Sequence, residues 1–273
     1  MTEKIVGIRF QKVGKVYHFD ATQFSDIVVG DHVIVDTSRG QQLGTVVQIL
    51  TDAQAVGKQD DLKPVLRTAT PRDLVSRQAW EEKEVEVIEY CRQQLGELKL
   101  PGVKIIAAEF TLNGDRLTVL HTLDGNDKLD MIPLRKAVQE EYRTKVSLRK
   151  IGPRDAAKII GGLGACGLET RCCTMHMTEF IPISIKMAKV QNVSLAPSEI
   201  TGMCGRLRCC LQHEYEFYTE ARKRMPKLKR VVATPLGEGK VIQVNPLTDT
   251  VKIDLGEQGR KEFPNDEIKP RGQ

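Results

Sequence analysis

Two short cysteine-rich segments constrain this chain more than any other feature. The first runs from Cys166 to Cys173 and the second from Cys204 to Cys210, and each begins Cys-Gly and ends Cys-Cys. Together they hold six of the seven cysteines. Several soft sulfur ligands close together are typical of a metal or cluster site. We therefore expect a thiolate-rich centre that orders two loops around it.

The candidate ligands are the cysteines of the two segments. They are Cys166, Cys172, Cys173, Cys204, Cys209 and Cys210. A histidine follows each Cys-Cys pair at the same distance, His176 and His213. These imidazoles are alternative ligands of a Cys/His zinc site, or polar residues that begin the next element. A redox thiol pair is the rival of both, although adjacent cysteines form a strained ring when oxidised.

Composition points to a water-soluble protein of several domains. The chain has 273 residues, 40% of them hydrophobic, and it contains no run of apolar residues long enough for a transmembrane helix. The N-terminus begins with a strand-like segment rather than a signal peptide, so we expect a cytoplasmic protein that is not an integral membrane protein. Cysteines are usually reduced in the cytoplasm, where clusters of them more often bind metal than form disulfides.

Both ends of the chain have strand patterns. Residues 4–10, 15–19, 32–35 and 44–49 are rich in β-branched residues and are separated by turn residues. Residues 33–47 resemble residues 231–242, since each is a strand, a glycine-bearing turn and a second strand. Shared hairpin chemistry explains this similarity as well as duplication does. We expect a small β-barrel-like module at each terminus.

The middle of the chain predicts an αββαβ unit. Residues 71–96 have helical periodicity, with Val75, Ala79, Val85, Ile88, Cys91 and Leu95 as the expected apolar stripe, so Cys91 is predicted to be a core residue. A hairpin around Asn113-Gly114, a helix over 128–142 and a strand over 146–151 follow. The predicted fold class is therefore α+β, with helices on one sheet face.

Four domains are predicted. They are an N-terminal β module (1–66), the central αββαβ unit (67–151), a cysteine-rich region (152–226) and a C-terminal β module (227–273). The cysteine-rich region includes predicted helices over 153–160 and 213–224.

A basic run lies at the end of this region. Six of the nine residues from 222 to 230 are basic, and the net charge is +5. We expect the run to be solvated, which leaves it available to RNA. The candidate RNA contacts are Arg222, Lys223, Arg224, Lys227, Lys229 and Arg230. No Ser-His-Asp set, metalloprotease motif or nucleotide loop is present, so we do not expect an enzyme.

At these residues the chain resembles the YaaT family, also called RicT, whose members have a PSP-type C-terminal domain. The resemblance covers residues 4–270, and the N-terminal stretches 7–10 and 14–20 match. It is strongest in three segments: residues 161–167, 183–192, and 202–211 followed by 214–218.

This resemblance implies a non-enzymatic cytoplasmic regulator. Family members associate with two small helical partner proteins, carry 4Fe-4S clusters, and act with the membrane-anchored ribonuclease RNase Y in mRNA processing. In spore-forming relatives they also affect sporulation, biofilm formation and competence. The resemblance assigns the cluster ligands to the six cysteines already named.

The chain departs from the family pattern in two places. Five residues separate Cys166 from Cys172, where the family usually has four, while the second segment keeps four. His176 and His213 are not family features. They favour the alternative hypothesis, a structural-zinc RNA-binding module.

Overall fold

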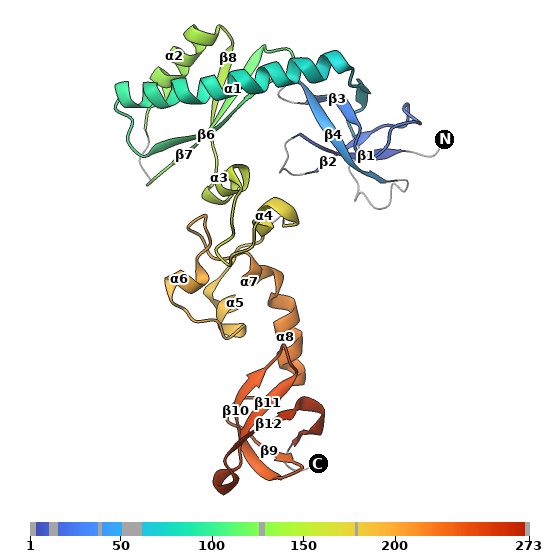
Figure 1. Cartoon of the computed structure of the whole chain (residues 1–273), viewed down its shortest axis with the longest axis vertical. Helices are drawn as coiled ribbons and strands as arrows, with labels where there is room; N and C mark the ends of the chain where they lie inside the picture. The colour runs from blue at the N-terminus through green and yellow to red at the C-terminus, as the bar shows by residue number, and fades with distance from the viewer. Residues whose placement is uncertain are drawn as a thin grey trace. The chain divides into compact units, whose positions relative to one another are not determined.

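The computed structural model describes residues 4–10, 16–37, 40–50, 62–125, 129–177 and 180–270. The chain divides into two compact units. The first comprises residues 1–179 with the short segment 203–206, and the second comprises residues 180–202 and 207–273. Figure 1 shows the elements along the chain. The architecture confirms the predicted α+β class, whereas the four predicted domain boundaries stay a prediction.

The N-terminal module is a five-stranded antiparallel sheet with the order β2-β1-β4-β3-β5. Its core consists mainly of valines and isoleucines, and Val33 and Val35 occupy alternate positions of one strand. The four predicted strands are present, and Lys15, the predicted start of the second, lies outside the described residues. The bounds are β1 (Ile5–Arg9), β2 (Tyr17–Asp20), β3 (His32–Thr37), β4 (Gly40–Leu50) and β5 (Val65–Thr68).

The long helix α1 (Pro71–Glu97) begins with a capping box. Thr70 accepts from the backbone N–H of Asp73, and the Asp73 carboxylate accepts from the backbone N–H of Thr70. The guanidinium of Arg67, in β5, binds both oxygens of the same carboxylate at 2.6 and 2.9 Å. This contact holds the pKa of Asp73 well below its usual range. The helix start is thereby fixed to the N-terminal sheet.

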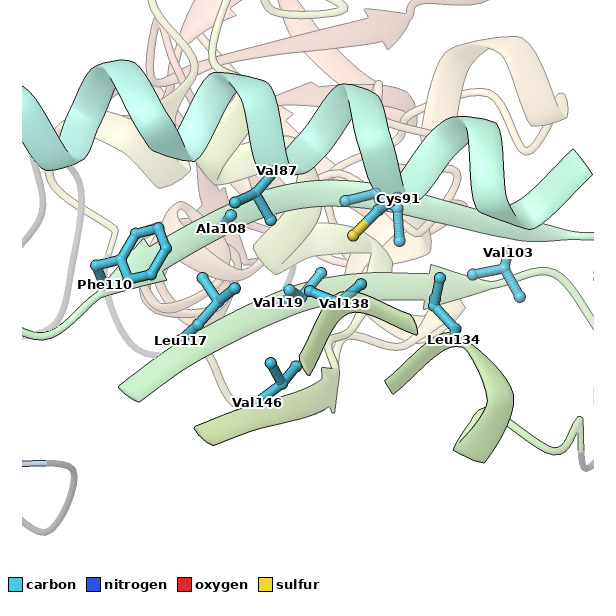
Figure 2. Close-up of a cluster of buried hydrophobic side chains, with 11 residues drawn as sticks. Val87, Cys91, Val103, Ala108, Phe110, Leu117, Val119, Leu134, Val138 and Val146 are labelled. Atoms are coloured by element: carbon cyan, nitrogen blue, oxygen red, sulfur yellow. The ribbon is translucent and has the colours of Figure 1, made fainter. Parts of the chain in front are cut away.

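The central sheet has the order β6-β7-β8, and α1 and α2 contribute to one core with it (Figure 2). The strands β6 and β7 form the hairpin predicted at Asn113-Gly114, and the crossover through α2 makes β7 and β8 parallel. A bulge between Ile105 and Ala107 shifts the β6 register, so Val103, Ile105, Ala108 and Phe110 all face the helices. The bounds are β6 (Val103–Phe110), β7 (Arg116–Leu123), α2 (Ile132–Tyr142) and β8 (Lys145–Lys150). The predicted start of the second helix, Lys128, lies outside the described residues.

The predicted apolar stripe of α1 is partly wrong. Val75, Ala79 and Val85 are exposed, and Val85 leaves 57% of its surface in solvent. The buried positions are Glu84, Val87 and Cys91, with Ile88 and Leu95 packed beside them. The stripe was misplaced because a glutamate occupies its centre. Cys91 is a core residue as predicted, and burial raises the pKa of its thiol to about 11.

Glu84 accepts a hydrogen bond from the last residue of β6 and binds Arg77 of its own helix. Arg77 binds both of its carboxylate oxygens, at 2.8 and 3.1 Å, and the backbone N–H of Phe110 donates to it at 2.8 Å. Trp80 packs on Phe110 with ring centroids 4.8 Å apart, and its indole donates to the carbonyl of Leu112. A side chain at Gly114, where φ is +71°, would collide with the Trp80 ring. These contacts fix the position of α1 against the end of the β6–β7 hairpin.

The C-terminal module is a second five-stranded antiparallel sheet, with the order β12-β11-β10-β9-β13 and a core around Val241, Val251 and Ile253. Its hairpin β9–β10 resembles the hairpin β3–β4 of the N-terminal module, as predicted. Thr37 pairs with Gly40 and Thr234 with Gly237, and each threonine hydroxyl donates to the carbonyl of its glycine. The bounds are β9 (Val231–Thr234), β10 (Gly237–Asn245), β11 (Thr250–Asp254), β12 (Arg260–Pro264) and β13 (Lys269–Pro270).

Candidate metal centre

The first cysteine segment follows helix α3 (Pro153–Ile160), which has the predicted bounds. Gly161 and Gly162 end the helix with φ of +70° and +93°, values that L side chains rarely adopt. The loop then folds back, since the N–H of Gly164 donates to the carbonyl of Leu168. Cys166 is exposed on this loop, and a Cβ at position 164 would make an ordinary van der Waals contact with its Sγ, at 3.4 Å.

The Cys-Cys pair of the first segment begins the short helix α4 (Cys172–Met175). Cys172 is half-buried and Cys173 is buried. The carbonyl of Cys172 accepts from the N–H groups of His176 and Met177, which closes the turn. The two neighbouring thiols therefore differ in their access to solvent.

The second segment is a turn followed by another short helix. An antiparallel bridge between Thr201 and Leu207 brackets the turn that holds Cys204, and Gly205 has φ of +73°. Cys209 caps helix α7 (Cys210–His213), whose Leu211 is buried. The amide of Gln191, at the end of α5 (Ile185–Val190), donates to the Leu211 carbonyl at 2.6 Å. Cys204, Cys209 and Cys210 are all half-buried.

The two compact units share the cysteines unevenly. Cys166, Cys172 and Cys173 belong to the first unit, and so does the segment 203–206 that carries Cys204. Cys209 and Cys210 belong to the second unit. The first unit thus holds four of the six candidate thiols. No disulfide joins any of the seven cysteines, all of which lie in the described residues.

Within the described residues, no three His, Cys, Asp or Glu side chains are grouped as a metal would need. His176 follows α4 and His213 ends α7, and both side chains are exposed. The ligand set, with or without these histidines, remains a prediction.

The basic run is not uniformly solvated, so that expectation is wrong at one residue. Arg222 is half-buried in helix α8 (Tyr215–Arg224), and its guanidinium donates to the side chain of Asn192 at 2.6 Å. Lys223, Arg224 and Lys227 are exposed. Lys229 and Arg230 also have exposed side chains, but their backbone groups pair with Val241 of β10. α8 ends before Pro226, as predicted, although it begins at Tyr215.

Sequence reasoning overlooked two residues of the site. Arg171 and Arg208 each stand directly before a Cys-Cys pair. Each guanidinium group donates to two backbone carbonyls that lie before the first cysteine of its segment. The repeated triplet Arg-Cys-Cys was the available signal.

No helix in the described ranges combines the length and the apolar character that crossing a membrane requires. Two family models match the chain. The PSP1 C-terminal conserved region matches residues 63–151, from just before β5 to the end of the central sheet, and the third domain of PSP1-like proteins matches residues 182–225. These matches define a PSP1-type protein.

A curated relative gives the more particular assignment. The Stage 0 sporulation protein YaaT of Bacillus subtilis (strain 168) is 35% identical over 254 residues, which cover 92% of this chain and 90% of the relative. The chain therefore belongs to the YaaT family. A comparison with solved structures found no match.

Proposed function

We propose that this chain is a non-enzymatic, cytoplasmic adaptor that holds a 4Fe-4S cluster through its cysteine segments. It acts with two small helical partner proteins on RNase Y-dependent mRNA processing. In spore-forming organisms it also contributes to sporulation, biofilm formation and competence. The similarity to a protein named for stage 0 of sporulation supports the role in sporulation.

The observation that carries the proposal is that four of the six candidate cysteines lie in one compact unit and form no disulfide. Cys166, Cys172, Cys173 and Cys204 match the number of thiolates that hold one 4Fe-4S cluster. Their sulfur donors suit iron–sulfur chemistry, and the cluster would supply redox-sensitive cross-linking of the two loops. Loss of iron would then disorder the surface around both segments.

Metal analysis tests this function. We expect the anaerobically prepared protein to hold about four iron and four sulfide per chain, with broad absorbance near roughly 400 nm. If a partner supplies a ligand to a second cluster, the reconstituted complex will hold more iron per chain than the isolated chain. A colourless protein that contains stoichiometric zinc would contradict the proposal.

A structural-zinc RNA-binding module is the second candidate, because Lys223, Arg224 and Lys227 are exposed close together in the chain. This function predicts that replacing the three residues with Gln weakens RNA binding and flattens its salt dependence by about one unit per lost phosphate contact. Arg222 is kept, since it bonds to Asn192. Filter binding across a salt series measures the slope.

The matched control removes the same charge elsewhere in the same unit. Lys240, Lys252 and Lys261 are exposed on the C-terminal sheet. Their triple Gln variant should leave the salt slope unchanged. If the first triple variant also has the wild-type slope, the basic run does not contact RNA and its role is protein–protein adaptation.

A further inference from the structure

The arginines before the two Cys-Cys pairs make equivalent contacts. The Nε of Arg171 donates to the carbonyl of Leu163 at 3.0 Å, and the Nε of Arg208 donates to the carbonyl of Thr201 at 3.2 Å. Leu163 stands three residues before Cys166, and Thr201 stands three residues before Cys204. In both segments, therefore, the arginine Nε binds the carbonyl three residues before the first cysteine.

Each guanidinium also has a second acceptor farther back. A terminal nitrogen of Arg171 donates to the carbonyl of Ala157, in the last turn of α3, at 2.6 Å. A terminal nitrogen of Arg208 donates to the carbonyl of Ser198 in α6 (Pro197–Ile200) at 2.9 Å. Each arginine thus joins three stretches: the preceding helix, the approach to the first cysteine, and the start of the Cys-Cys helix.

The extra residue of the first segment does not disturb this arrangement. Five residues separate Cys166 from Cys172 and four separate Cys204 from Cys209, yet the Nε contact is the same. In both segments the glycine after the first cysteine has positive φ, +87° at Gly167 and +73° at Gly205. The added residue lies within the loop, between two ends that the arginine fixes.

We propose that Arg171 and Arg208 are positioning residues that hold the first cysteine of each segment in register with the Cys-Cys pair that follows. The inference rests on the proposed thiolate-ligated centre. A planar guanidinium presents several N–H groups in a fixed fork and can bond two carbonyls at once. Lysine keeps the charge but offers a compact ammonium group that cannot reproduce the fork.

The test compares Arg171→Lys and Arg208→Lys with Arg206→Lys, an exposed arginine in the second segment. Each protein is reconstituted anaerobically with iron and sulfide, and loss of absorbance to an iron chelator is timed. We expect the Arg171 and Arg208 variants to lose the cluster about tenfold faster than wild type, as for other supports of metal ligands. Arg206→Lys should match wild type.

A second readout separates positioning from general stability. The affinity of the metal-free proteins for Co²⁺ is measured from the thiolate-to-cobalt absorption, together with their melting temperatures. We expect weaker Co²⁺ binding by proteins that remain folded at the assay temperature. Lower melting temperatures with wild-type cobalt affinity and cluster lifetime would show that the arginines only stabilise the fold.

Two further outcomes are distinct. If wild type binds metal and both arginine variants behave like it, the positioning role is excluded while the proposed function stands. If wild type takes up neither iron with sulfide nor Co²⁺, both proposals fail. Arg171 and Arg208 belong to different compact units. A folding failure at one therefore leaves the other as the test.

Discussion

Replacing Cys204 with Ser will remove iron and colour from the chain, whereas the double variant His176→Ala and His213→Ala will keep both. A hydroxyl is a poor substitute for a thiolate on a soft metal, so the cluster loses one of its ligands. The exposed imidazoles are not needed when all ligands are sulfur. Iron, sulfide and zinc content, with the absorption spectrum, measure the result.

Cys91→Ala is the matched control for the loss of a thiol. Cys91 is fully buried in the central core and lies outside both segments, so its replacement should lower stability without changing the iron content per folded chain. Loss of metal from the folded histidine variant would contradict an all-cysteine site. It would assign the chain to the zinc hypothesis, because a zinc site loses affinity by orders of magnitude without one of its ligating imidazoles.

Replacing Glu84 with Ala will destabilise the central unit by about 1–3 kcal/mol. The change leaves the backbone N–H of Phe110 without its acceptor, in a site where Glu84 is only 9% exposed, and leaves Glu81 as the remaining carboxylate partner of Arg77. Burial raises the pKa of the Glu84 carboxyl even though both partners oppose that shift. The contacts with Arg77 and Phe110 therefore offset the desolvation of the carboxylate only in part. Denaturant unfolding followed by circular dichroism measures the loss.

Glu81→Ala provides the comparison on the same helix. Glu81 also pairs with Arg77, at 3.2 Å, but its side chain is 60% exposed. An exposed ion pair contributes little, so we expect a loss below about 1 kcal/mol. Equal losses in the two variants would show that the buried carboxylate adds nothing beyond an ordinary surface pair.

Local sequence patterns predicted most of the regular elements. The hairpin at Asn113-Gly114 and the helix 153–160 were predictable because turn glycines and an N-terminal proline mark their ends. The α+β class followed from the order of these elements. The strand β5 and the short helices α4, α5 and α6 were not predicted. A helix of four to six residues has too few positions to show a helical period.

The buried face of α1 shows where pattern reasoning fails. Val75 and Val85 are apolar and exposed, while Glu84 is charged and buried. A periodicity argument counts apolar residues and cannot include a carboxylate whose burial depends on Arg77 and on a strand end about 26 residues away. The bulge in β6 has the same character, because register is a property of the strand pair rather than of either strand.

The sequence alone determined which chemistry is available: six thiols in two matching segments, two histidines at equal offsets and a basic run. These follow from residue type and spacing, which do not depend on folding. Only the tertiary structure decided that Cys204 belongs to the unit of Cys166, and that Arg171 and Arg208 bind carbonyls three residues before a cysteine. Such relations are contacts between separate stretches of chain. They exist only after hydrogen bonds and buried side chains have brought those stretches together.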